Sequence, residues 1–106
     1  DEATDNEKKF DVELVMRDLE KVNELQPDFP FSYYNKANIL CTLKDFRSAI
    51  FNYTKAIEID NDFAEAYYNR GLTYLYIGED AKGLSDLSKA GELGIYGAYN
   101  LIQRLK

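Results

Sequence analysis

The sequence predicts an all-α protein of antiparallel helix pairs, with about six helices in 106 residues. Two observations lead to this fold class. Similar residues return every 34 positions, which is a period found in helical repeat arrays. Within each period, apolar residues recur at spacings of three and four, as on one side of an amphipathic helix. We therefore expect a repeat array in which each unit is one helix-turn-helix.

The 34-residue period is visible in three sets of aligned residues. Residues 33–35 and 67–69 both read Tyr-Tyr-Asn, and residues 28–29 and 62–63 both read Asp-Phe. A five-residue phrase occurs three times, as KVNEL, KAIEI and KAGEL, beginning at Lys21, Lys55 and Lys89. Because the matches fall at the same place in each unit, they indicate a true internal repeat.

The first helix is predicted to begin after the capping box formed by Thr4 and Glu7, with residues 1 to about 5 frayed. It ends at Gln26, before Pro27. Its apolar stripe consists of Val12, Val15, Leu19 and Val22.

Five further helices follow from the turn residues. The second runs from Pro30, a residue suited to a first helical turn, to about Leu43. The third covers about 46–59 and the fourth about 63–77, ending on Gly78 as a left-handed cap. The fifth runs over about 80–93 until Gly94 breaks it, and the sixth covers about 96–105. The apolar side of that last helix predicts a cap over the fifth.

The spacing within each unit follows one pattern. The first full unit reads Tyr33-x-x-Lys36-Ala37-x-x-Leu40, then Ala49-x-x-x-Tyr53, then Ala56. The second reads Tyr67-x-x-Arg70-Gly71-x-x-Tyr74, then Gly83-x-x-x-Leu87, then Ala90. A preceding half unit offers Val15-x-x-x-Leu19, Val22 and Pro27.

This pattern resembles the tetratricopeptide repeat, over about residues 10 to 97. The resemblance implies a right-handed α-α superhelix. It divides the chain into a polar N-terminal extension (1–9), the second helix of a partial repeat (10–29), two full repeats (30–63 and 64–97) and a capping helix (98–106).

Two departures from the family pattern carry expectations of their own. Lys36 and Arg70 replace the usual Leu, so we expect that edge of each first helix to be solvated. Gly83 and Gly91 stand inside the fifth helix, where each costs about 0.5–1 kcal/mol relative to Ala. For Gly83 we expect close approach of a neighbouring helix, because its counterpart Ala49 is also small.

The faces of the first helices locate a candidate binding surface. A helical wheel places Tyr33, Ala37 and Leu40 inward, and the second face of each first helix forms one concave surface. The candidate partner-binding residues on it are Phe31, Tyr34, Asn35, Asn38, Tyr68, Asn69, Leu72 and Tyr76.

The chemistry of this surface suits a peptide or a helix. Tyr rings provide an apolar contact surface while their hydroxyls stay hydrated, and Asn amides can form hydrogen bonds with a peptide backbone. The resemblance implies the same role for Asn at this place. It also implies that a chaperone C-terminal tail is not the ligand, because Tyr34 and Tyr68 stand where the Lys residues would be. The alternative is structural, with Tyr34 and Tyr68 packed between first helices and Asn35 and Asn69 bonded within the scaffold.

The composition argues against catalysis and against several kinds of ligand. With no His and one Cys, the chain has no imidazole base, no Cys-His pair and no internal disulfide, so we expect no enzyme, no metal and no cofactor. A net charge of −6 disfavours nucleic acid and favours a neutral or basic protein partner. No apolar run is long enough for membrane insertion. Cys41 is expected to be a buried small hydrophobe.

The sequence thus predicts a non-enzymatic protein-protein interaction module that binds a peptide or helix of a partner in its groove. The alternative is a structural segment of a longer protein, stacking end to end or forming a homodimer through exposed end helices. Because the chain begins with Asp1, we expect a soluble fragment or processed product. Its compartment is not predicted.

Overall fold

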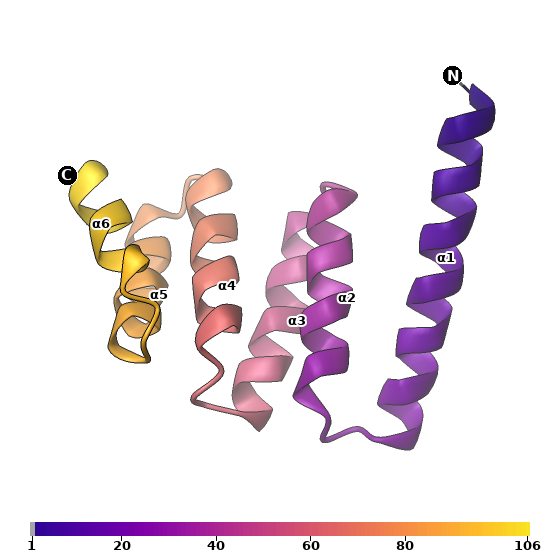
Figure 1. The fold of residues 1–106 in the computed structure, drawn as a ribbon, viewed down its shortest axis with the longest axis horizontal. Helices are drawn as coiled ribbons and strands as arrows, with labels where there is room; N and C mark the ends of the chain where they lie inside the picture. The colour runs from indigo at the N-terminus through magenta and orange to yellow at the C-terminus, as the bar shows by residue number, and fades with distance from the viewer. Residues whose placement is uncertain (1) are drawn as a thin grey trace.

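The computed structural model describes the backbone of residues 2–106 and the side chains of residues 11–106. This part of the chain forms six helices and confirms the predicted all-α class (Figure 1). They are α1 (Glu2–Leu25), α2 (Pro30–Thr42), α3 (Phe46–Ile59), α4 (Ala64–Tyr76), α5 (Asp80–Glu92) and α6 (Gly97–Arg104). From α2 onward the predicted boundaries agree to within one residue.

Local signals explain most of these boundaries. Pro30 begins α2, and the Asp45 carboxylate caps α3 by accepting a hydrogen bond from the Ser48 backbone N–H at 3.4 Å. Gly78 ends α4 with a φ of 86°, which confirms the predicted left-handed cap. Lys44, one period earlier, adopts a φ of 63° at the corresponding turn, although its Cβ disfavours that region.

The start of α1 differs from the prediction. The helix already begins at Glu2, so Thr4 and Glu7 lie inside it rather than at its end, and residues 2–5 are helical. The side chains of Thr4 and Glu7 lie outside the described residues, so the predicted capping bonds stay a prediction.

The helices stack as a one-dimensional array (Figure 1). Each helix contacts its neighbours in the chain, and α2 and α4 also contact each other. The first helices α2 and α4 run in one direction, whereas α1, α3 and α5 run in the opposite one. The molecule measures 42 × 36 × 19 Å as a result. This arrangement brings the second faces of α2 and α4 side by side.

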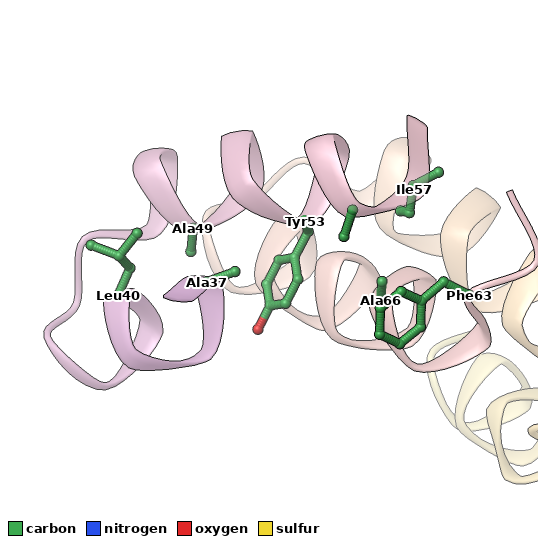
Figure 2. Close-up of a cluster of buried hydrophobic side chains, with 8 residues drawn as sticks. Ala37, Leu40, Ala49, Tyr53, Ile57, Phe63 and Ala66 are labelled. Carbon is green, nitrogen blue, oxygen red and sulfur yellow. The ribbon is translucent and has the colours of Figure 1, made fainter. Parts of the chain in front are cut away.

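The core consists of two clusters that follow the repeat. The first joins α2, α3 and the start of α4 through Ala37, Leu40, Ala49, Tyr53, Ala56, Ile57, Phe63 and Ala66 (Figure 2). The second joins α5 to α6 through Leu87, Ala90 and Ala98. The inward positions Ala37 and Leu40 are buried as predicted, and Tyr33 is half-buried against the first cluster. Since α6 supplies Ala98 to the second cluster, it packs on α5.

Two glycines allow α4 and α5 to cross closely. A Cβ on Gly83 would lie 2.9 Å from the Gly71 carbonyl oxygen and 2.7 Å from the Leu75 Cγ. A Cβ on Gly71 would in turn lie 3.0 Å from the Gly83 carbonyl oxygen. The predicted close approach at Gly83 is therefore confirmed, with Gly71 as its partner.

Candidate functional site

The surface that α2 and α4 share is tied together by side-chain hydrogen bonds. The Asn69 amide of α4 donates to the Tyr34 hydroxyl and to the Asn38 side-chain oxygen of α2, both at 3.1 Å. The Tyr53 hydroxyl of α3 also donates to the Asn38 oxygen. Burial raises the pKa of Tyr53 far above its usual range, so this hydroxyl keeps its proton and remains a donor.

Cys41 and Thr73 extend this network along the two helices. The Cys41 sulfur lies 3.4 Å from the Thr73 hydroxyl and 3.7 Å from the Tyr53 hydroxyl. Thr73 is buried. Cys41 is only half-buried, although we expected it to be fully buried. The bonds connect three helices of two successive repeats, so the relative position of α2 and α4 is fixed at this level.

The eight candidate residues, which we call the α2–α4 face, divide into two groups. Tyr34, Asn38, Tyr68 and Asn69 are half-buried. Asn69 uses both amide hydrogens within the fold, as in the structural alternative, and the Tyr34 ring packs on Phe63 with centroids 4.8 Å apart. Tyr68 packs against the second core cluster. These four residues form the floor of the face.

The other four residues are exposed above this floor. They are Phe31 (52% exposed), Asn35, Leu72 (37%) and Tyr76 (72%). Their side chains add apolar area and one amide to a surface whose floor is already hydrogen-bonded.

The two exposed aromatic residues mark the ends of the α2–α4 face. Phe31 is the second residue of α2, and its ring packs on Phe63 at 5.0 Å. Tyr76 is the last residue of α4, and its ring packs on Phe46 at 4.7 Å. Because α2 and α4 run in the same direction, these rings lie at opposite ends of the face, with Asn35 and Leu72 between them.

Arg70 corrects a prediction, because its edge of α4 is not solvated. Its side chain is 16% exposed, and the guanidinium forms two hydrogen bonds of 2.7 Å to the Asp86 carboxylate of α5. It also donates to the Thr54 hydroxyl of α3 at 3.1 Å and lies against the Tyr67 and Tyr74 rings. Burial alone would lower the pKa of Arg70, but the bonds and charge of Asp86 raise it above its usual value.

Lys36 occupies the same place one repeat earlier and is only partly solvated. Its side chain is 21% exposed, and its amine lies 3.6 Å from the Glu20 carboxylate of α1. Because the partners of these cations lie on α1 and α5, both cations point away from the α2–α4 face. Each one ties its first helix to the preceding second helix.

A pocket of about 340 Å³ opens beside Arg70, away from the α2–α4 face. Its walls are Arg70, Tyr74, Ala81, Lys82, Ser85 and Asp86. The cations there already have acidic partners, since Lys82 lies 3.1 Å from Glu79. Glu79 also accepts a hydrogen bond from Arg47 of α3 at 3.1 Å. Its hydrogen bonds with Lys82, the larger effect, and with Arg47 lower the pKa of Glu79. The ion pair between Arg47 and Glu79 therefore links the repeat of residues 30–63 to the repeat of residues 64–97.

The described residues contain no cluster of three side chains suited to holding a metal ion. In the same part of the chain, no helix combines the length and the apolar character needed to cross a bilayer.

Comparisons with known proteins agree with the repeat unit. A family model described as a TPR repeat matches residues 37–78. Over 80 residues the chain is 31% identical to the UDP-N-acetylglucosamine--peptide N-acetylglucosaminyltransferase of Giardia intestinalis. That match covers 76% of this chain but only 5% of the transferase, so the chain spans a small part of that enzyme's length.

Two solved structures share the fold. The first TPR of Spaghetti (RPAP3), bound to the HSP90 peptide SRMEEVD, superposes with a TM-score of 0.82 at 19% identity and covers 97% of this chain and 83% of that one. YrrB, a TPR protein with an unusual peptide-binding site, gives a TM-score of 0.69 at 28% identity and covers 73% and 40%. Residues 37–78 therefore belong to a tetratricopeptide repeat, and the period and the helix stacking extend the same fold to the neighbouring helices.

Proposed function

We propose that the chain is a non-enzymatic module that binds an extended segment or a helix of a partner protein on the α2–α4 face. The observation that carries the proposal is the exposure of Phe31, Leu72 and Tyr76 above a floor held by the Asn38–Asn69–Tyr34 bonds. A rigid floor lowers the entropy lost on binding, and exposed rings supply the contact area. Both solved structures above are peptide-binding TPR proteins by description, which supports a peptide ligand.

The free groups on the face suit backbone recognition. Asn35 is exposed, and Asn69 keeps its side-chain oxygen as an acceptor because its hydrogen bonds within the fold use the amide hydrogens. An extended peptide offers both donors and acceptors along its backbone. Apolar side chains of that peptide would then rest on Leu72 and on the rings at either end.

The charges favour a neutral or basic partner. The eight residues include no Lys or Arg, and the nearest cations on these helices, Lys36 and Arg70, are paired on the other side. The net charge of −6 also repels acidic ligands and speeds the approach of basic ones.

A selected peptide tests the site. Peptides are chosen from a random display library on the wild-type chain, and the affinity of one is measured by isothermal titration calorimetry. We expect Tyr76→Ala and Leu72→Ala each to weaken binding about tenfold, because truncating a residue that carries much of the binding energy costs more than about 1 kcal/mol. Phe51→Ala is the matched control, since Phe51 of α3 is 61% exposed but lies outside the face. Equal affinities for all variants would overturn the proposed site.

The acidic peptide SRMEEVD tests the ligand class. We expect no saturable binding of this peptide, because the α2–α4 face offers no cation for its carboxylates. Tight binding that is lost in Tyr76→Ala would show that the face accepts acidic tails and would contradict the charge argument, while leaving the location of the site intact.

A further inference from the structure

Helices α3, α4 and α5 enclose a second groove, on the side of the array away from the α2–α4 face. Arg70 of α4 lies on its floor, and the guanidinium bonds Asp86 of α5 and Thr54 of α3. Each of these three helices packs against a helix before it and a helix after it, so the walls and the floor have their neighbours in place. We call this surface the outer groove, and its residues are Arg47 and Thr54 of α3, Arg70 and Tyr74 of α4, and Lys82 and Ser85 of α5.

The pocket of about 340 Å³ beside Arg70 opens into the outer groove. One side of the pocket is the Tyr74 ring, whose centroid lies 5.8 Å from the Arg70 guanidinium and 5.6 Å from the Lys82 amine. Ala81 and Ser85 line the α5 side. The volume is at the small end of the range for ligand pockets, about 300–1,000 Å³, and therefore suits one large side chain.

The charges around the pocket are positive in sum. Arg47 and Lys82 share one acidic partner, since each lies 3.1 Å from a different oxygen of Glu79. Their side chains nevertheless remain 72% and 65% exposed. Asp86 does not offset them, because Arg70 bonds both of its oxygens. Three cations therefore meet two carboxylates, which leaves one net positive charge in a chain whose total is −6.

An exposed aromatic ring lies along the α3 wall of the outer groove. Phe51 stands four residues after Arg47 and three before Thr54, so the three side chains follow one stripe of α3. The ring is exposed, and the Lys55 amine lies 5.4 Å from its centroid. The groove thus offers two aromatic faces, Tyr74 in the pocket and Phe51 at its edge, each with a cation nearby.

We propose that the outer groove binds an acidic segment of a partner protein and takes one aromatic side chain of that segment into the pocket. The aromatic side chain stacks on Tyr74 between the cations of Arg70 and Lys82, and anchors of this kind carry much of the energy of an interface. Acidic residues on either side of the anchor bond Arg47 and Lys82.

The local charge decides the ligand class at this groove. Exposed charges are screened beyond about 8 Å at physiological ionic strength, so distant acidic residues of the chain have little effect there. The α2–α4 face offers no cation and the outer groove offers three, so the two surfaces select segments of different charge. The outer groove does not depend on ligand binding at the α2–α4 face, because the two surfaces lie on different sides of α4.

A tryptophan peptide measures this binding directly, because the chain itself contains no Trp. The probe is the end-blocked peptide EEWEE, titrated with the 106-residue chain while its Trp emission is recorded. We expect a saturable blue shift, with an affinity at least about tenfold higher than that of the matched basic peptide KKWKK. An absent shift, equal affinity for both peptides, or displacement of EEWEE by an oligothymidylate at lower concentration than by unlabelled EEWEE overturns the proposal.

Charge reversal on the groove wall tests the position of the acidic residues. Lys82→Glu should weaken EEWEE binding about tenfold or more and strengthen KKWKK binding, an exchange of preference that a misfolded chain cannot give. Lys21→Glu makes the same charge change at an exposed position of α1, outside the groove, and should leave both affinities within about twofold. A Lys82→Glu variant that binds EEWEE as the wild type does overturns the site.

Two aromatic variants separate the outer groove from the α2–α4 face. Phe51→Ala should weaken EEWEE binding about threefold or more and leave a peptide selected on the α2–α4 face unaffected. Tyr76→Ala should have the reverse effects. Loss of EEWEE binding in Tyr76→Ala would place this peptide on the α2–α4 face and overturn the outer groove as its site, while the function proposed for the α2–α4 face would stand.

Discussion

At the scale of single residues, Arg70 replaces an apolar contact by an ion pair. Its guanidinium bridges Asp86 of its own unit and Thr54 of the preceding one, and the Tyr67 and Tyr74 rings flank it. Taking two charges out of water costs several kcal/mol per ion, which a bidentate pair with further hydrogen bonds can offset. We therefore expect the fold to lose stability when one partner of the pair is removed, and to keep most of its stability when both are replaced.

This expectation gives a double-variant experiment. Arg70→Leu leaves the Asp86 carboxylate buried without its partner, and should lower the free energy of unfolding by about 3 kcal/mol. Arg70→Leu with Asp86→Leu removes both charges and should recover most of that loss. Urea unfolding followed by circular dichroism measures both values. A double variant as unstable as the single one would show that the bonds to Thr54 and the ring contacts, rather than the ion pair, hold this position.

Sequence reasoning missed this pair for a physical reason. A helical wheel gives the direction of a side chain relative to its own axis, but not which neighbouring helix lies there. Arg70 points away from the α2–α4 face, and α3 and α5 both reach the side on which it lies. The available signal was Asp86, an acidic residue between Gly83 and Leu87 on the inward side of its helix. The partners of Asn69 could not be predicted from the sequence for the same reason, because they depend on the spacing of α2 and α4.

At the scale of helices, two small residues set the separation of α4 and α5. Gly71 and Gly83 present backbone to each other, so a Cβ at Gly83 meets a carbonyl oxygen at 2.9 Å that cannot turn aside. Gly91 differs, because a Cβ there meets the outer ring atoms of Tyr99, the nearest at 2.6 Å. Tyr99 is 41% exposed and can swing outward. The two glycines of α5 therefore have different structural roles.

Alanine substitutions separate these roles. Gly83→Ala gains about 0.5–1 kcal/mol of helix propensity but forces overpacking that costs about 1–3 kcal/mol, so we expect a net loss of about 1–2 kcal/mol. Gly91→Ala gains the same propensity and displaces one movable ring, so we expect a change within about 0.5 kcal/mol. Thermal unfolding of both variants gives the comparison. A higher melting temperature for Gly83→Ala would refute the packing explanation.

Most helix positions were predictable because their signals are local. Pro30, Asp45 and Gly78 act on the backbone next to them, so they mark their boundaries in any tertiary context. The start of α1 was not predictable in this way. A capping-box pattern at Thr4 and Glu7 also suits a helix interior, and nothing downstream requires the helix to begin there.

At the scale of the whole molecule, stability follows the order of the array. In a repeat protein each helix is held by its neighbours, so a terminal helix with one neighbour opens at a lower free energy than a central one. None of residues 11–25 of α1 is buried, whereas α3 contributes five buried residues. The single chain should therefore be least stable at α1.

Hydrogen exchange read by mass spectrometry tests this gradient. In dilute solution we expect the amides of α1 to exchange about tenfold or more faster than those of α3 and α4. Equal exchange of all helices in dilute solution would contradict the gradient, because the array would then open as one unit.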